Sequence, residues 1–176
     1  MSSCARCACA SGEDVVPCGW CGGFADRRAI ASVADADGGA RAGVLCPICR
    51  DPRRESGLLC VVGKYEDMLA VEATGTMKGR YFILGTLVSV LADTQEELPV
   101  ERLRLVLREQ DLREIILATP PSVDGDATAL MLRSEIVAAG TIKITRIATG
   151  LAQGSDLEFA DITTLGGAMS NRRDLT

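Results

Sequence analysis

The sequence predicts an α/β fold in which a mostly parallel sheet, covered by helices on both faces, follows a small four-cysteine metal-binding module. Two observations support this expectation. Strand-like apolar runs alternate with helical patterns from Leu58 onward, and C-x2-C pairs crowd the part of the chain before that residue. Alternating strands and helices are typical of parallel sheets. Cysteines two residues apart can direct both thiolates at one tetrahedral metal ion.

Composition limits both the fold and the class of function. The 176 residues are enough for one ordinary domain and a small appended module. Apolar residues make up 47% of the chain but aromatic residues only 3%, so we expect an aliphatic core. The formal net charge of −5 argues against a generally basic nucleic-acid-binding protein. Any contact with nucleic acid would therefore need a local basic patch.

The cysteine usage indicates metal binding rather than disulfides. The chain has eight cysteines and no histidine, and its start lacks the charged and apolar regions of a secretory signal. No apolar run reaches the roughly 18 residues of a membrane span. We therefore expect a cytoplasmic, nucleoid-associated protein with no membrane partner. Thiols stay reduced there, and the lack of histidine implies an all-cysteine site.

Three C-x2-C pairs are available for one four-ligand zinc site. We expect a zinc finger over residues 18–57, with a long Ala/Gly/Asp-rich insert between its two halves. The four expected structural zinc ligands are Cys18, Cys21, Cys46 and Cys49. The surplus pair, Cys4 and Cys7, lies in an N-terminal extension over residues 1–17. Two alternatives stay open for that pair, since it can belong to a frayed terminus or help to hold a second ion.

Strand and helix patterns alternate through residues 58–153, the expected extent of the α/β domain, before a C-terminal segment at 154–176. Apolar, β-branched runs predict strands at 58–62, 81–84, 114–118, 143–148 and about 162–165. Helical periodicity and end signals predict helices at 65–74, from Pro99, and from near Asp126 to Gly140.

Two carboxylates follow the strand at 114–118, where α/β folds place their binding sites. Asp124 and Asp126 are two residues apart and can share a divalent cation. An ordinary structural role competes with this interpretation. Asp126 can cap a helix, and Asp124 with the following glycine can form a turn.

Ordered motifs over residues 18–176 resemble the bacterial RecR recombination mediators. The matching pieces are Cys18 to Phe24, Cys46 to Val62, Glu72 to Gly75, Gly79 to Tyr81, Ile116 to Pro121, Asp124 to Thr128, Arg146 to Leu151 and Gly154 to Leu165. The resemblance implies a four-cysteine zinc finger followed by a Toprim domain. It further implies a homo-oligomer that binds single- and double-stranded DNA without chemistry. RecR proteins act with RecO and RecF to help load recombinase on single strands.

Three features depart from the family pattern. Only 17 residues precede Cys18, so we expect the N-terminal helix-hairpin-helix module to be absent. The 24-residue spacer between Cys21 and Cys46 is longer than the family's. Gly63 stands where Toprim domains place a glutamate that acts as general acid/base. We therefore expect no enzymatic activity and no magnesium cofactor. A purely conformational role is the alternative for Gly63, with positive φ at a tight turn.

Two functions from different classes follow. The first is a RecR-like DNA-binding adaptor in recombinational repair, which contacts phosphates in a sequence-independent way. Its expected DNA-contacting residues are Arg50, Arg53, Arg54, Lys78 and Arg80. The alternative is a zinc-ribbon Toprim nuclease or primase-like enzyme that holds magnesium on Asp124, Asp126 and Asp156. A truncated, non-functional relative is a further alternative.

Overall fold

The computed structural model describes residues 14–27, 44–89, 98–109 and 111–172. The expected extension that carries Cys4 and Cys7 lies outside these residues, as does most of the insert. The chain forms two compact units, Met1–Thr145 and Arg146–Thr176.

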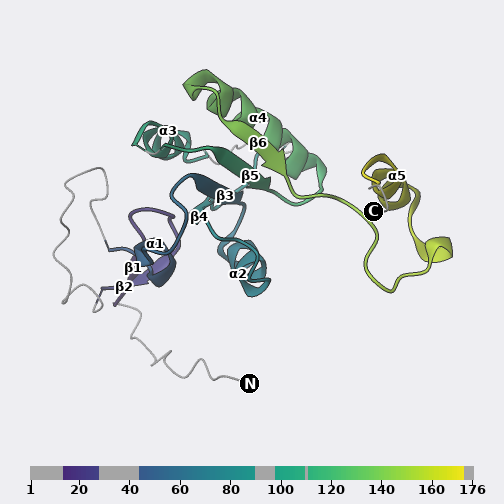
Figure 1. The fold of residues 1–176 in the computed structure, drawn as a ribbon, viewed down its shortest axis with the longest axis horizontal. Helices are drawn as coiled ribbons and strands as arrows, with labels where there is room; N and C mark the ends of the chain where they lie inside the picture. The colour runs from purple at the N-terminus through teal and green to yellow at the C-terminus, as the bar shows by residue number, and fades with distance from the viewer. Residues whose placement is uncertain (1–13, 28–43, 90–97, 110, 173–176) are drawn as a thin grey trace. The chain divides into compact units, whose positions relative to one another are not determined.

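A four-stranded sheet forms the centre of the first unit (Figure 1). Its strands are β3 (Leu58–Val62), β4 (Arg80–Ile83), β5 (Glu114–Ala118) and β6 (Lys143–Arg146), in the order β4-β3-β5-β6. The central strand β3 runs parallel to β4 and to β5, with Leu59 opposite both Arg80 and Ile115. The strands predicted at 58–62 and 114–118 are confirmed.

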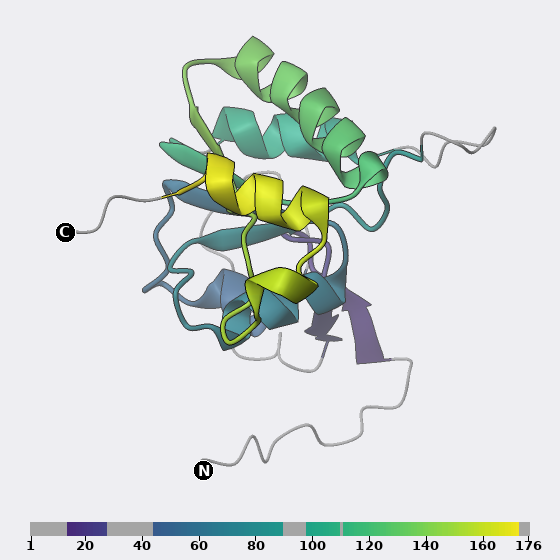
Figure 2. The same cartoon turned by 90° about the vertical axis from the view of Figure 1, so that its right-hand side faces the viewer.

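The strand β3 is buried on both faces, which explains its unbroken apolar sequence. Leu59, Val61 and Val62 are fully buried in the core. Such continuous apolar runs are typical of parallel strands that are covered on both sides. Figures 1 and 2 show the covers: α2 (Tyr65–Ala73) lies on one face, and α3 (Val100–Glu109) and α4 (Val123–Ala139) lie on the other. The predicted α/β class is therefore confirmed.

Local signals explain where the helices begin and end. The Asp67 carboxylate accepts a 2.9 Å hydrogen bond from the Lys64 backbone N–H and caps the start of α2. Gly75 has φ 65° just after this helix, a left-handed conformation that favours glycine. At α4 the Ser122 hydroxyl accepts a 3.1 Å bond from Gly125 N–H. This cap starts the helix at Val123, ahead of the expected start near Asp126.

The cysteine-bearing module contributes three short elements to the same unit. These are the antiparallel strands β1 (Val15–Pro17) and β2 (Phe24–Asp26) and the one-turn helix α1 (Pro47–Arg50). Its buried cysteines and Trp20 belong to the same hydrophobic cluster as the sheet. The module and the sheet thus share one core.

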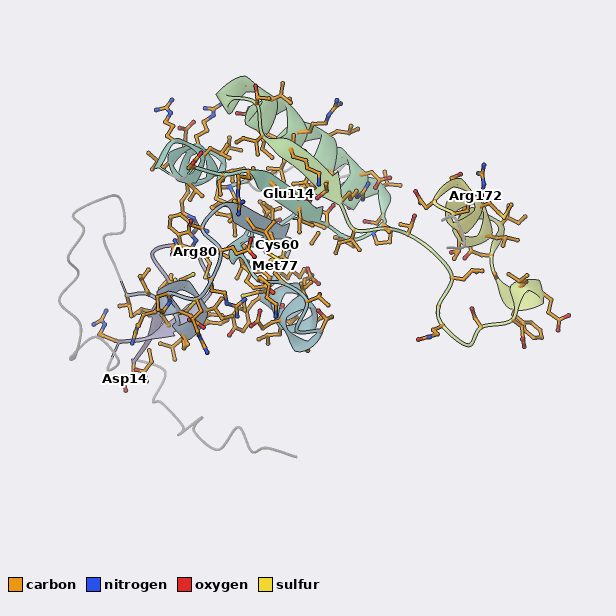
Figure 3. All side chains as sticks on the ribbon, in the orientation of Figure 1. Asp14, Cys60, Met77, Arg80, Glu114 and Arg172 are labelled. Carbon is orange, nitrogen blue, oxygen red and sulfur yellow. The ribbon has the colours of Figure 1, made fainter. Side chains whose placement is uncertain are left out.

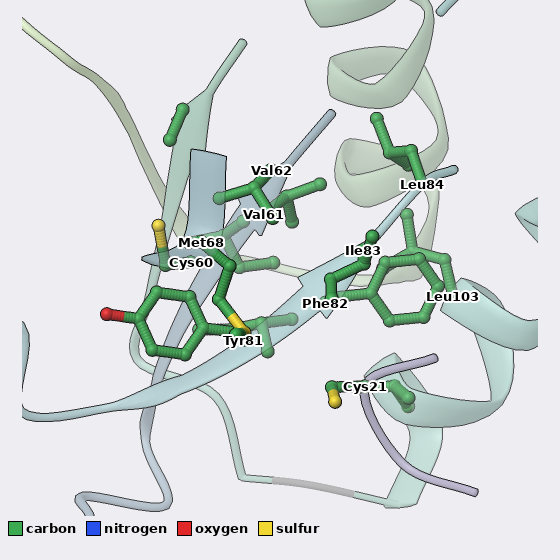
Figure 4. Close-up of a cluster of buried hydrophobic side chains, with 14 of the residues drawn as sticks. Cys21, Cys60, Val61, Val62, Met68, Tyr81, Phe82, Ile83, Leu84 and Leu103 are labelled. Carbon is green, nitrogen blue, oxygen red and sulfur yellow. The ribbon is translucent and has the colours of Figure 1, made fainter. Parts of the chain in front are cut away.

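The core is largely aliphatic, as expected, but its two largest fully buried side chains are Tyr81 and Phe82. Both come from β4, and Figure 4 shows them with Cys21 and Leu103 in the buried cluster. These two aromatic side chains therefore belong to the same core cluster as the cysteine module.

The second unit contains a short 3-10 turn, η3 (Leu157–Phe159), and the helix α5 (Ile162–Ser170). The strand predicted at about 162–165 is therefore wrong. Asp161 caps α5, since its Oδ1 accepts a 2.9 Å bond from Thr164 N–H. The β-branched residues after Asp161 favour a strand locally, and the cap overrides that preference.

Within the described residues, no helix combines the length and the apolar character needed to cross a membrane.

Candidate metal centre and nucleic-acid interface

Four buried cysteines meet in the first unit. Cys18 and Cys21 lie in the turn between β1 and β2, Cys46 caps α1, and Cys49 lies within α1. Their sulfur atoms all lie within 4.8 Å of one another, and the Sγ atoms of Cys21 and Cys46 are 3.7 Å apart. A tetrahedral zinc ion with bonds of about 2.3 Å holds its sulfurs about 3.8 Å apart. The spacing of this four-cysteine cluster fits such an ion.

Backbone amides point at three of the sulfurs. Gly23 N–H donates to Cys21 Sγ over 3.3 Å, Cys46 N–H to Cys18 Sγ over 3.3 Å, and Cys49 N–H to Cys46 Sγ over 3.4 Å. Hydrogen bonds to the charged form of a group favour ionisation. Hydrogen bonds among the four side chains hold the pKa of the Cys18 and Cys46 thiols below the usual range and raise the pKa of Cys21 and Cys49. The backbone amides that point at sulfur are therefore what favours thiolates, the form that binds metal.

The basic residues expected to contact DNA differ in their surroundings. The Arg53 side chain is 88% exposed and pairs with Asp51 through a 2.8 Å bond from Nη2. The Arg54 side chain is only 14% exposed and forms an ion pair with Glu72. Arg54 Nη1 also donates to Met77 O over 3.2 Å. Arg53 therefore faces solvent, whereas Arg54 ties residues 50–54, the basic turn, to α2.

The other three basic residues also contact groups within the first unit. Lys78 Nζ donates to Gly75 O and Arg50 Nη2 to Leu45 O, both over 3.0 Å. The Arg80 guanidinium lies 5.5 Å from the centre of the Trp20 ring, and Figure 3 labels Arg80 near the start of β4.

Two shallow pockets bring parts of this set together. A pocket of about 300 Å³ is lined by Asp51, Arg53, Arg54, Glu72, Gly75, Met77 and Lys78. A neighbouring pocket of about 350 Å³ is lined by Asp26, Leu45, Pro47, Arg50, Asp51 and Pro52. Asp51 lines both pockets. The structure thus gathers three of the five basic residues in one hollow and places Arg50 in the adjoining one.

The three carboxylates of the expected acidic metal site fall in different units. Asp124 and Asp126 lie in the first turn of α4, where the helix dipole favours carboxylates. Asp156 belongs to the second unit and precedes η3. In the described part of the chain, the four-cysteine cluster is the set of potential ligands whose atoms converge.

The structure contradicts the alternative of a positive φ at Gly63. Gly63 is buried at the end of β3, and its φ is not positive, so the left-handed conformation considered for it is wrong. A Cβ atom at residue 63 would lie 3.2 Å from Asp67 Oδ2 and 3.3 Å from Leu87 Cδ2. The nearest carboxylate is therefore that of Asp67, which caps α2.

Sequence reasoning missed the partners of Arg54. The hydroxyl of Tyr81 donates to Glu72 Oε2 over 2.8 Å, and the same carboxylate pairs with Arg54. Glu72 and Tyr81 both lie in motifs that the resemblance had singled out. The position of Glu72 in such a motif was the one sequence signal that it could form an internal ion pair.

Comparison with known proteins assigns the family. The model for the Toprim domain matches residues 57–148, and the model described as RecR, C-terminal, matches residues 150–173. The Recombination protein RecR of Psychrobacter cryohalolentis is 38% identical over 161 residues, which are 91% of this chain and 73% of that protein. This chain belongs to the RecR family. The RecR resemblance seen in the sequence is thus confirmed.

Other RecR proteins match a shorter stretch. The Recombination protein RecR of Bifidobacterium adolescentis is 40% identical over 129 residues, covering 73% of this chain and 64% of the relative. That of Myxococcus xanthus is 45% identical over 131 residues, covering 74% of this chain and 66% of the relative. The chain therefore spans about two thirds of the length of these RecR relatives.

Proposed function

We propose that this RecR-family protein is a DNA-binding adaptor in recombinational repair, which acts on single-stranded DNA together with RecO- and RecF-type partners and as a homo-oligomer. The observation that carries the proposal is the pair of consecutive family matches, to the Toprim domain and then to the RecR C-terminal region. The relatives are named recombination proteins.

We propose that the protein does no chemistry on DNA. A Toprim enzyme needs a proton-transfer group at the end of its first strand, and Gly63 offers no side chain there. The carboxylates of Asp124 and Asp126 lie at a helix start, where a structural role is sufficient to explain them. We accordingly propose that magnesium is not a cofactor.

We infer that the four-cysteine cluster holds a structural zinc ion. The supporting features are the sulfur spacing, the burial and the amide hydrogen bonds to sulfur. Four thiolates fill the coordination sphere of zinc and leave no position for a reactive water. When bound, the ion would cross-link the β1–β2 turn to α1, and it would take no part in catalysis.

We propose that the same five basic residues form the DNA interface: Arg50, Arg53, Arg54, Lys78 and Arg80. The first four line the two shallow pockets, over which phosphates would bind. Arg53 and Lys78 are the best-supported members, because both side chains line the 300 Å³ pocket from exposed positions. Asp51 now pairs with Arg53, so a phosphate would have to replace this carboxylate. Arg54 would contribute by fixing the turn that carries Arg53.

A salt titration tests this interface. We expect an Arg53→Ala, Lys78→Ala double variant to bind single-stranded DNA more weakly and with a smaller dependence on salt. Each lost phosphate contact reduces the slope of log affinity against log salt by about 0.7 for single strands. Arg108→Ala, which removes an exposed arginine from α3, is the matched control. If the double variant has the same slope of log affinity against log salt as the parent, these residues do not contact DNA.

A further inference from the structure

Arg102 reaches from α3 to the backbone of a cysteine ligand. Its Nη2 atom donates to Cys21 O over 3.0 Å and to Ile83 O over 3.3 Å. The guanidinium also lies 4.6 Å from the centre of the Phe82 ring. Ile83 N–H donates to the same Cys21 carbonyl over 2.9 Å. One carbonyl of the four-cysteine cluster is therefore held by both β4 and α3.

The approach of Arg102 to the ligand backbone is very close. A Cβ atom at Gly22 would lie only 2.3 Å from Arg102 Nη2, so no larger residue fits at this position while the guanidinium stays in place. Gly22 also has φ 79°, a left-handed conformation that favours glycine. The guanidinium thus packs directly against the peptide between Cys21 and Gly22.

The positive charge of Arg102 would lie beside the negative charge of a zinc-loaded four-cysteine cluster. Four thiolates around one Zn²⁺ carry a formal charge of −2, because four negative charges meet two positive ones. In the described part of the chain, Arg102 forms no ion pair with a carboxylate, unlike Arg104 on the same helix.

We propose that Arg102 is a positioning residue for the metal centre, which holds the Cys21 carbonyl in place and offsets the negative charge of the zinc-loaded cluster. The proposal rests on the inferred zinc ion. Groups that hydrogen-bond to a metal site from outside the ligand set typically change its affinity by about 10- to 100-fold. In this proposal the Arg102 side chain couples zinc binding to the packing of α3 on the sheet.

The test compares zinc affinities in competition with a chromogenic chelator. Arg102→Met keeps the apolar stem and removes the charge, and Arg108→Met makes the same change at an exposed site on α3. We expect Arg102→Met to bind zinc at least about tenfold more weakly than the parent. Arg108→Met should match the parent. Equal affinities in the parent and both variants would overturn the role of Arg102.

Two further measurements separate this role from general support of the fold. Thermal melts of each protein with and without zinc should show a smaller zinc-induced rise in Tm for Arg102→Met. A merely structural residue would lower both melts equally, which would overturn the proposal. If Arg102→Met does not fold, Arg102→Gln removes the charge with a smaller loss of hydrogen bonding, and the same weakening is expected.

Cobalt substitution provides a spectroscopic readout. Removing a positive charge near the thiolates should move the thiolate-to-cobalt absorption band to longer wavelength in Arg102→Met and not in Arg108→Met. An unmoved band in Arg102→Met would contradict the electrostatic role. A parent protein that holds no zinc on elemental analysis would instead contradict the inferred metal itself, so the two failures are distinguishable.

Discussion

The hydroxyl of Tyr81 donates a 2.8 Å hydrogen bond to the carboxylate of Glu72. This bond joins β4 to α2, and the same carboxylate pairs with Arg54 of the basic turn. The phenol is fully buried with its ring, whereas the carboxylate is only partly covered. Glu72 therefore links three segments of the first unit, and its charge state should influence stability.

We expect Glu72→Gln to destabilise the protein by about 2 kcal/mol, because it leaves the largely buried Arg54 without its counter-charge. Glu66→Gln is the matched control, since Glu66 is an exposed residue of the same helix. Urea denaturation of the parent and both variants measures the effect. Similar losses in the two variants would show that the ion pair adds nothing to stability.

The same carboxylate predicts a pH dependence. The Arg54 guanidinium holds the pKa of Glu72 below its usual range. The folded state therefore binds this proton less readily than the unfolded state, so the stabilisation is present above the ordinary glutamate pKa of about 4.3. It should be lost as the pH falls below that value. Stability curves between about pH 6 and pH 3 should converge for the parent and Glu72→Gln, and parallel curves would contradict the prediction.

Metal analysis tests the ligand set. We expect Cys49→Ser to lose the zinc and to unfold the cysteine module, because the four-cysteine cluster shares one core with the sheet. Cys60→Ala should keep the zinc, since Cys60 is buried in β3 and burial raises its pKa to about 12. Cys4→Ser should keep it as well. Loss of zinc from Cys4→Ser alone would show that a different set of cysteines binds the ion.

Much of the fold could be predicted from local patterns. The run from Leu58 to Val62 is apolar without interruption, and that pattern alone identifies a strand buried on both faces. The C-x2-C spacing likewise pointed to the two pairs that converge in the described residues, although spacing alone left Cys4 and Cys7 as a third candidate pair. The helix at Ile162 was missed because a side-chain cap from Asp161 decides it, against the preference of the β-branched residues that follow.

The candidate sites were harder to predict, because their chemistry depends on distant partners. Arg53 and Arg54 are adjacent in sequence, yet one faces solvent and the other pairs with Glu72 across the fold. Arg102 lies in an amphipathic stretch, and nothing in its neighbours indicates the cysteine module that it contacts. Sequence patterns identify residue types for a function, and tertiary contacts decide which of them remain available.

The surroundings of Gly63 predict that a substitution at this position can create a cation site. Gly63→Glu should place a second carboxylate beside Asp67, whose Oδ2 lies 3.2 Å from the position of the new Cβ atom. Without metal, repulsion and crowding should lower Tm. Magnesium or manganese should bind this variant more tightly than the parent and restore part of the loss, because hard cations prefer anionic oxygen ligands. Gly63→Gln is the control of equal size, and identical metal titrations for the two variants would rule out the site.

The close contact between Gly22 and Arg102 can be measured with a second glycine as the reference. Gly22 and Gly75 both have positive φ, at 79° and 65°, but only the Cβ of residue 22 would meet other atoms. Gly75→Ala should therefore cost only the backbone strain, about 1 kcal/mol. Gly22→Ala should cost more, since it also displaces the guanidinium of Arg102. In an Arg102→Ala background that excess should disappear, so the pair should be non-additive by about 1 kcal/mol in urea denaturation. Strict additivity would mean that the guanidinium does not lie against this peptide in solution.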